Sequence, residues 1–425
     1  MYTQEIKPKD EYKVTRTVYI IECMFEYFVS ILISGAYLAK LTTTIGISDS
    51  MTAILSSVAS LAAMFQVFSI FLAHRTPVKR WVLPMTVIPQ VLVAGLYLIP
   101  FLKIGVLAPI LFFVISLINQ AAHNIVAPAT SNWFFSPVEP SKRGDFQAKI
   151  SIVSLIGGTV FTFITGLAMD KFEAEGRLNT LFICLTVVIF VFALIQMLCL
   201  MIAKSDTIKV EKKESPFKSI KAITKNKAFM QMLILSSIWA VANNITSPFL
   251  STYQIKELGF SMSFISTVTI VLNFLNILVV YLTGKYSKKH SYSSIFKASF
   301  VFGLLGFAVI TFTTPSNGHV MFTIYRVFLL FLGATAGISS TALIFSIVEE
   351  TERTAALAFK SIITGLLGFS TTLLISPLFP ILQNSDIVIF GMKFYAQQVL
   401  AFISFLITLI ILIYYQFFCK KLNKR

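Results

Sequence analysis

The stretch Ser136-Pro-Val-Glu-Pro-Ser-Lys-Arg143 occurs twice in this chain of 425 residues. The second copy, Ser346-Ile-Val-Glu-Glu-Thr-Glu-Arg353, lies at positions 210 higher, with Ser, Val, Glu and Arg kept in register. The same offset relates Gly158 to Gly368 without a gap. A fixed self-similarity of this kind indicates a duplicated unit. We therefore interpret the chain as two related halves.

Hydrophobic residues make up 56% of the chain and charged residues only 13%. A soluble domain usually carries about 25% charged residues, so this chain has too little polar surface to face water everywhere. The composition predicts a polytopic membrane protein. The formal net charge of +16 would suggest a nucleic-acid partner if the basic residues shared one soluble face. They lie instead in short loops between apolar runs, which argues against nucleic acid.

A bilayer core about 30 Å thick requires roughly 20 apolar residues per helix. By this measure the first half contains six predicted spans, near residues 17–39, 51–73, 81–102, 104–127, 147–169 and 178–203. The second half contains six more, near residues 228–252, 261–283, 293–314, 319–346, 355–380 and 392–418. We predict an all-α integral membrane protein with twelve transmembrane helices in two pseudo-symmetric six-helix bundles. The expected boundaries are 1–203, a basic linker over 204–227, and 228–425.

Lysines and arginines gather in alternate loops, and this asymmetry predicts the orientation of the chain. The rich set includes both chain ends and a linker with eight lysines between Lys204 and Lys227. The poor set holds only Lys40, Lys103, Lys171, Arg177, Lys256 and Lys393. The N-terminus does not read as a cleavable signal peptide, so the first apolar run should remain as an anchor. We expect a multi-pass protein of the cell membrane with both termini cytoplasmic.

Several kinds of chemistry are missing from the sequence. The four cysteines show no Cys-x-x-Cys spacing, and no His, Cys and Asp cluster has the spacing of metal ligands. No Gly-x-x-x-x-Gly-Lys-Ser/Thr loop is present for a nucleotide, and no Gly-x-Ser-x-Gly nucleophile motif occurs. We therefore expect neither an enzyme nor a bound cofactor or metal.

In its layout the chain resembles the major facilitator superfamily, which has two six-helix halves and a basic loop after helices 2 and 8. The family signature after helix 2 is Gly-x-Leu-Ala-Asp-Arg-x-Gly-Arg-Lys, and the window 70–79 keeps Leu72, Ala73, Arg75 and Lys79. It departs by placing His74 where Asp is expected. The second copy keeps Leu282 and Lys289, with Lys285 for the arginine and Gly284 for the Asp. The loop 133–144 resembles the family's Pro-x-x-Arg-Gly pattern, which Pro140 begins.

The resemblance implies that helices 1, 4, 7 and 10 line a central cavity, and those four predicted helices carry a marked load of polar residues. Asn273 and Asn276 on helix 8 are interpreted instead as hydrogen bonds between helices. Ionisable side chains cost about 2.5–3.5 kcal/mol in a span, so their positions are informative. The predicted spans 5, 9 and 11 contain little more polar than Ser, Thr or Gly in their middles. The candidate substrate and ion pathway is Glu22, Glu26, Asn119, His123, Asn124, Trp239, Asn243, Asn244 and Arg326.

Glu22 and Glu26 are four residues apart and hence share one face of a helix. Two carboxylates in a dry environment cannot both ionise comfortably, which favours a site that binds a proton or a substrate ammonium group. The alternative for Glu22 is a place near the headgroups, paired with Arg16. A buried Arg326 requires a carboxylate, which Glu26 could supply across the cavity, or an anionic substrate group.

The simpler alternative for the amides is a hydrogen bond between helices, and for His123 a satisfied interior position. At the cytoplasmic side, the basic loops and both copies of the repeated stretch form the candidate gate, with the two glutamates and two arginines of the stretch as candidate inter-helix pairs. The gate residues are Arg75, Lys79, Glu139, Arg143, Lys285, Lys289, Glu349 and Arg353.

The resemblance implies a secondary transporter that moves a small organic solute by alternating access. Coupling to protons, coupling to sodium or another cation, and facilitated diffusion are all left open. Two alternatives are a multidrug efflux protein of the same fold and a non-transporting receptor or assembly partner. Helix 5 lacks the Gly-Pro ending of the family's drug-antiporter signature, which counts against efflux. The expected partners are the solute and the lipid bilayer, with the chain working as a monomer.

Overall fold

The structure is a computed structural model, and it describes residues 12–73, 78–102, 104–135, 137–139, 142–204, 223–287, 289–349, 352–385, 388–389 and 392–418. These residues are almost entirely helical. The exception is a short antiparallel pair of strands, β1 (Val388–Ile389) and β2 (Met392–Lys393). The predicted all-α class is confirmed.

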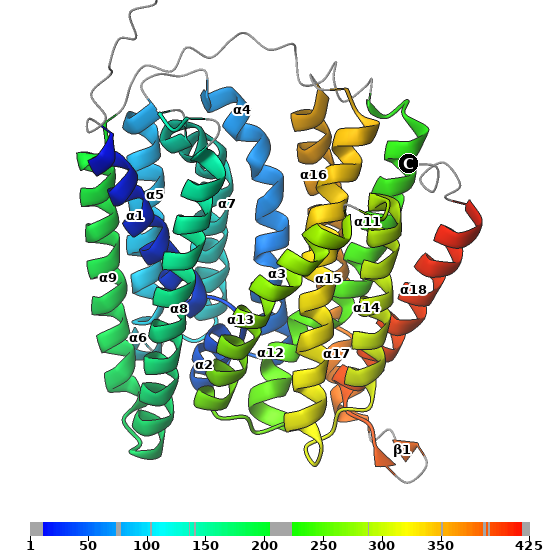
Figure 1. Cartoon of the computed structure of the whole chain (residues 1–425). Coiled ribbons are helices and arrows are strands. Elements are labelled where there is room, and N and C mark those ends of the chain that lie inside the picture. The colour runs from blue at the N-terminus through cyan, green and yellow to red at the C-terminus, as the bar shows by residue number, and fades with distance from the viewer. Residues whose placement is uncertain are drawn as a thin grey trace, which may run out of the picture. The chain divides into compact units, whose positions relative to one another are not determined.

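Figure 1 shows the helices in chain order. Up to residue 202 they are α1 (Lys13–Leu32), α2 (Gly35–Ile45), α3 (Asp49–Ala62), η1 (Ala63–Val67), α4 (Phe68–Ala73), α5 (Val78–Leu96), α6 (Ile99–Leu102), α7 (Leu107–Phe135), α8 (Arg143–Ala174) and α9 (Leu178–Ile202). After the linker they are α11 (Lys227–Thr246), η3 (Ser247–Phe249), α12 (Leu250–Thr252), η4 (Tyr253–Glu257), α13 (Met262–Ser287), α14 (Tyr292–Thr311), α15 (Gly318–Ile347), α16 (Arg353–Ile375), α17 (Phe379–Asn384) and α18 (Ala396–Phe418).

Within the described residues, ten helical segments are long and apolar enough to cross a membrane, and α1 with α2 makes an eleventh if the pair is one span. This pair bends by 44°. The bend falls at Gly35, whose φ of 53° lies in the left-handed region that glycine adopts without strain. α5 covers most of the predicted span 81–102 but is not among these segments, and it carries Pro84 and Pro89 in its interior. Several membrane-spanning helices are therefore present as predicted, and the count of twelve stays a prediction.

The described chain forms two compact units. The first contains residues 12–37 and 65–204, and the second contains residues 38–64 and 223–418. α3 lies in the first half of the sequence but packs in the second unit, where it contacts α16 and η3. The predicted boundaries at 203 and 228 stay a prediction, because residues 205–222 of the predicted linker lie outside the described residues.

In the first unit, α1 packs against α8 and α9. Tyr19 of α1 stacks on Phe134 of α7 with ring centroids 4.0 Å apart, and Phe28 stacks on Phe161 of α8 at 4.8 Å. Between helices in lipid, close packing rather than exclusion of water provides most of the attraction. These aromatic contacts therefore fix the rotation of α1 within its unit, and so the direction of its two carboxylates.

In the second unit, α11 packs against α16 and α18, as α1 packs against two helices in the first unit. The Trp239 ring lies 6.0 Å from the ring of Phe300 and 5.7 Å from that of Phe307. The indole fits here because Gly303 has no side chain, since a Cβ at that position would lie 2.6 Å from the ring. The packing of this unit thus places one large aromatic side chain of α11 against α14.

Candidate functional site

Two predicted site residues meet in the first unit. Glu26 lies on α1 and His123 lies on α7, and Oε1 of the carboxylate is 2.6 Å from Nδ1 of the imidazole. The glutamate side chain is 31% exposed and the histidine side chain is 49% exposed, so both remain accessible. The distance is that of a short hydrogen bond between an acid and a base, which can share one proton.

A cavity of about 250 Å³ adjoins this pair. Its lining comprises Cys23, Glu26, Tyr27, Val29, Ser30, Ile33, Met85, Thr86, Gln90, Asn119, Gln120, His123 and Val126. Three predicted residues are therefore in its wall. Asn124 is not part of this lining, and its Nδ2 donates to the carbonyl oxygen of Gln120, 2.8 Å away on the same helix. Glu22 lies one turn before Glu26 and is 3% exposed, outside this lining.

One residue of the wall, Gln90, belongs to an amide pair that was not predicted from the sequence. Nε2 of Gln196 on α9 donates to Oε1 of Gln90 on α5 at 3.1 Å, and both residues are buried. Two glutamines inside predicted spans were the available signal, because a buried amide requires a partner. The pair holds α5 to α9 and so fixes the side of the cavity that Gln90 lines.

The second unit contains a larger cavity, of about 500 Å³. Trp239, Asn243 and Asn244 of α11 line it, and their role in a solute pathway stays a prediction. Lys360 of α16 lines it as well, and its Nζ donates to Oγ of Ser340 on α15. This lysine was not predicted, because it lies outside the middle of the predicted span 355–380. Among the described residues, no Asp or Glu lines this cavity.

The two asparagines of α11 already take part in hydrogen bonds. Nδ2 of Asn244 donates to the carbonyl oxygen of Ala240 at 2.9 Å, and the residue is buried. Oδ1 of Asn243 accepts from Oγ of Ser247 at 2.8 Å. Asn244 therefore helps to hold the helix in its place, while Asn243 retains an amide NH₂ group for the cavity.

The repeated glycines each receive a side chain from another helix. A Cβ on Gly158 would overlap Cε1 of Tyr27, and a Cβ on Gly368 would lie 2.6 Å from Nδ2 of Asn244. Real Cβ atoms do not come so close, so the missing side chain is what permits each approach. Tyr27 and Asn244 both line cavities. The 210-residue repeat therefore has a packing basis that reaches the cavity walls.

Arg326 lies on α15 and is partly buried. Within the described part of the chain it forms no ion pair or hydrogen bond, and it lines neither of the two cavities described above. The predicted charge partner is therefore not seen among the residues that surround it in its own unit.

Three of the candidate gate residues, Lys79, Arg143 and Arg353, bind backbone carbonyls. Nζ of Lys79 donates to the carbonyl oxygens of Met201 and Ala203 at the end of α9, at 2.5 and 3.0 Å. Carbonyls at a helix C-terminus lack partners within the helix, so a lysine there acts as a cap. Arg75 lies outside the described residues.

Both arginines of the repeated stretch also bind backbone carbonyls, one beyond the end of a helix and one in a last turn. Nε of Arg143 donates to the carbonyl oxygen of Val138 at 3.2 Å, just after α7 ends. Nη2 of Arg353 donates to the carbonyl oxygen of Phe345 at 3.0 Å, in the last turn of α15. Glu139 pairs with Lys142 at 2.6 Å. For the other gate candidates, the described part of the chain shows no side-chain hydrogen bond or ion pair at Lys285, Lys289 and Glu349.

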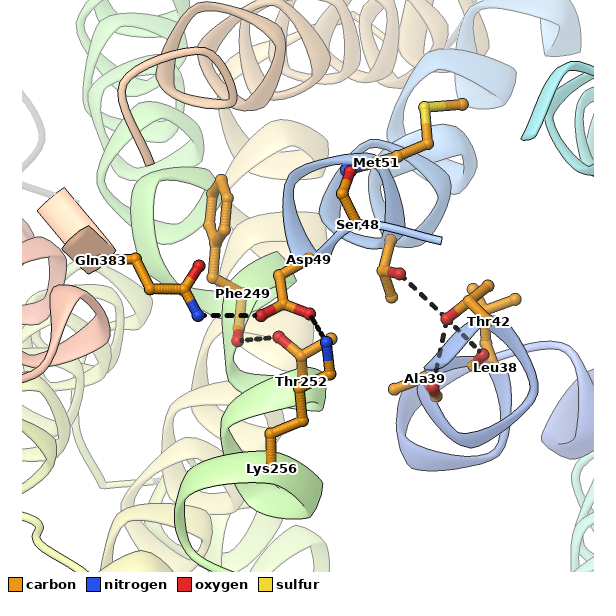
Figure 2. Close-up of polar contacts among 11 residues, drawn as sticks. Leu38, Ala39, Thr42, Ser48, Asp49, Met51, Phe249, Thr252, Lys256 and Gln383 are labelled. Carbon is orange, nitrogen blue, oxygen red and sulfur yellow. Dashed lines mark hydrogen bonds and ion pairs between the residues drawn. The ribbon is translucent and has the colours of Figure 1, made fainter. Parts of the chain in front are cut away.

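A polar cluster at the start of α3 was also missed (Figure 2). Oδ1 of Asp49 lies 2.5 Å from Nζ of Lys256 on η4, and Oδ2 accepts from Nε2 of Gln383 on α17 at 3.2 Å. The aspartate side chain is 6% exposed and the lysine side chain is 35% exposed. The helix starts here because Ser48 caps it, with Oγ accepting from the amide of Met51 at 3.3 Å. In the sequence, the one indication of this cluster was Lys256, which lies in the set of alternate loops that holds few lysines and arginines.

Comparison with known proteins identifies the family and the fold. Residues 19–372 match the family model described as Major Facilitator Superfamily. No curated protein matches the chain. Among solved structures, a point mutant of the nucleoside transporter NupG is 15% identical with a TM-score of 0.74, and the match covers 95% of this chain and 99% of that one. A D-xylose–proton symporter is 13% identical with a TM-score of 0.68, over 94% and 96% of the two chains.

The inward open xylose transporter XylE from E. coli is 12% identical with a TM-score of 0.66, over 94% of this chain and 95% of that one. At these identities the structural likeness shows that the chains share a fold. It does not identify the solute of this chain.

Proposed function

Because the chain belongs to the Major Facilitator Superfamily, a family of membrane transporters, we propose that it carries a small organic solute across the membrane by alternating access. Membership of this family makes it a transporter rather than an enzyme. We further propose twelve spans in two six-helix bundles, with the chain working as a monomer in the cell membrane. The charge asymmetry of the loops supports cytoplasmic termini.

The observation that carries the mechanism is the pair of Glu26 and His123 beside the first cavity. We propose that these side chains, 2.6 Å apart, exchange a proton with the solution during transport, which would change the net charge of the wall by one unit. Between unit charges 4 Å apart, the interaction is on the order of 4 kcal/mol at an effective dielectric constant of 20. A change of this size alters the balance between conformations, so the pair can couple proton movement to transport.

In the second unit, the candidate solute contacts are Trp239 and the free amide of Asn243. An aromatic face with a few convergent polar groups is typical of small-molecule sites. We propose Asn244 as a positioning residue, because its side-chain amide donates a hydrogen bond within α11 and packs against Gly368 of α16.

We propose that gating involves the ends of the helices. Lys79, Arg143 and Arg353 hold the carbonyl groups at helix ends on the side that the loop charges predict to be cytoplasmic. The ion pair of Asp49 with Lys256 lies at the start of α3, on the side that the loop charges predict to be opposite the cytoplasm. We propose it as a latch that must open when the second unit changes its packing. In this scheme the repeated stretch is a structural part of the gate and does not bind the solute.

Flux into liposomes tests the proposed function. Nucleosides and pentoses begin the panel of solutes, because a nucleoside transporter and a D-xylose–proton symporter share the fold. Organic acids, amines and dyes complete it. Uptake above that of protein-free liposomes supports transport, and no flux of any solute contradicts it. Raised drug resistance on overproduction would instead favour efflux, and thermal stabilisation by a ligand without flux would favour a receptor.

A further inference from the structure

The second cavity contains a cation without a counter-ion among its described lining residues. Lys360 lies on α16, within a segment that is apolar enough to span the membrane. In the described part of the chain its ammonium group binds only the hydroxyl of Ser340. An ionisable side chain in a span costs about 2.5–3.5 kcal/mol, and such residues usually pair with a charge or serve a ligand. Since the described lining of this cavity offers no carboxylate, a ligand is the natural source of the partner charge.

The rest of the lining includes uncharged polar groups and aromatic rings. Hydroxyl and amide groups come from Ser236, Asn243, Ser299, Ser340, Thr341, Ser361 and Thr364. Aromatic faces come from Trp239, Phe296 and Phe300. The volume of about 500 Å³ falls within the range of roughly 300–1,000 Å³ that is usual for small-molecule sites.

We propose that this cavity binds an aromatic monocarboxylate, with the carboxylate on Nζ of Lys360 and the ring against Trp239 and Phe300. A single ammonium group matches a single negative charge, whereas a phosphate dianion would be left half compensated. The hydrogen bond between an ammonium and a carboxylate is charge-assisted and stronger than one to a neutral solute. The inference rests on the proposed function, because it names the class of the transported solute.

The test is binding to the purified full-length protein in detergent, which does not depend on flux. Benzoate and indole-3-acetate are compared with benzamide and indole-3-acetamide, which have the same rings without the charge. Thermal unfolding and equilibrium binding are the two measurements. We expect each carboxylate to raise the unfolding temperature of the wild type and each amide to leave it unchanged.

Variants at Lys360 identify the site. Lys360→Met should bind the carboxylates about tenfold more weakly or worse, and Lys360→Arg should retain most of the affinity. Lys297→Met is the control, because that lysine binds Gln416 at 2.6 Å and does not line the cavity. If Lys360→Met does not fold, Lys360→Arg with Ser340→Ala provides the comparison, since the doubly changed protein keeps the charge but loses the hydroxyl and should bind more weakly than Lys360→Arg.

Three results would overturn the inference: stabilisation of the wild type by none of the carboxylates, equal stabilisation by the amides, or unchanged carboxylate affinity in Lys360→Met. Failure here is distinct from failure of the proposed function. Flux of a neutral solute without carboxylate binding would overturn the inference and leave transport intact. Carboxylate binding that depends on Lys360, without flux of any solute, would support the inference about the cavity and contradict transport.

Discussion

Replacing Lys256 by Met should destabilise the protein far more than replacing its partner Asp49 by Asn. The carboxylate of Asp49 is 6% exposed, whereas the ammonium of Lys256 is 35% exposed. Without the lysine, the buried carboxylate keeps, among the described side chains, only the amide of Gln383 at 3.2 Å. Without the aspartate, water can reach the lysine, and the asparagine still accepts a hydrogen bond.

The magnitude follows from this asymmetry. Removing one partner of a buried pair costs about 3–5 kcal/mol. The charge of Asp49 lies in the first turn of α3, where the helix dipole stabilises a negative charge by about 0.3–1 kcal/mol. Lys256→Met should therefore cost about 3 kcal/mol, the lower end of the range for a buried pair. Asp49→Asn removes an ion pair whose other member is partly hydrated, and should cost about 1 kcal/mol. The double variant should be more stable than Lys256→Met alone, because no charge is then left buried.

The assay is the free energy of unfolding in mixed detergent micelles for the wild type, the two single variants and the double variant, analysed as a cycle. The predicted order of stability is wild type, Asp49→Asn, the double variant, and Lys256→Met last. If Lys256→Met costs no more than Asp49→Asn, the carboxylate is not desolvated and the reasoning is wrong.

Two further predictions concern packing and capping. Gly158→Ala places a Cβ where the ring of Tyr27 lies, and should lower the unfolding free energy by about 1–3 kcal/mol. In the control Gly333→Ala, the new Cβ meets nothing within 4 Å, so this variant should be neutral or slightly stabilising. Equal thermal shifts for the two variants would contradict the contact with Tyr27. Ser48→Ala removes the acceptor for the amide of Met51 and should cost about 1 kcal/mol, while Ser48→Asn should restore most of it, as measured by the same unfolding titration.

The membrane helices were predicted well where apolar length alone decides the matter. The predicted span 319–346 lies within one residue of α15 (Gly318–Ile347) at each end. The first span was not predicted to break, because the break depends on one residue, Gly35, with a positive φ. A sum of hydropathy over a window does not contain that information.

The candidate site was predicted in part, and for a physical reason. A charged or strongly polar side chain inside a span is costly, so Glu26 and His123 could be identified as unusual from the sequence. That they meet each other depends on the packing of α1 beside α7, which is set by contacts such as that of Tyr19 with Phe134. These aromatic residues can be found in the sequence, but which of them stack on one another cannot be predicted from it.

The residues that were missed lie near the ends of helices. Lys360 lies outside the middle of its predicted span, and Asp49 is the first residue of α3, so neither stood out in the sequence as a charge deep in the membrane. Only the fold shows that one borders a cavity and that the other is buried against Lys256. At the gate, Arg353 binds the carbonyl of Phe345, because the last turn of a helix leaves such groups without partners. A count of charges in the sequence does not show this requirement.

Proton movement during transport tests the central claim most directly. In liposomes with a solute that the protein carries, an inside-alkaline pH gradient should accelerate uptake, and solute entry should raise the external pH. Glu26→Gln keeps the size of the side chain but cannot exchange a proton with His123, so it should lose both effects while still exchanging solute. Glu175→Gln, which removes an exposed acid beside Arg177, should behave as the wild type. Solute uptake by Glu26→Gln that still follows the pH gradient would contradict the account.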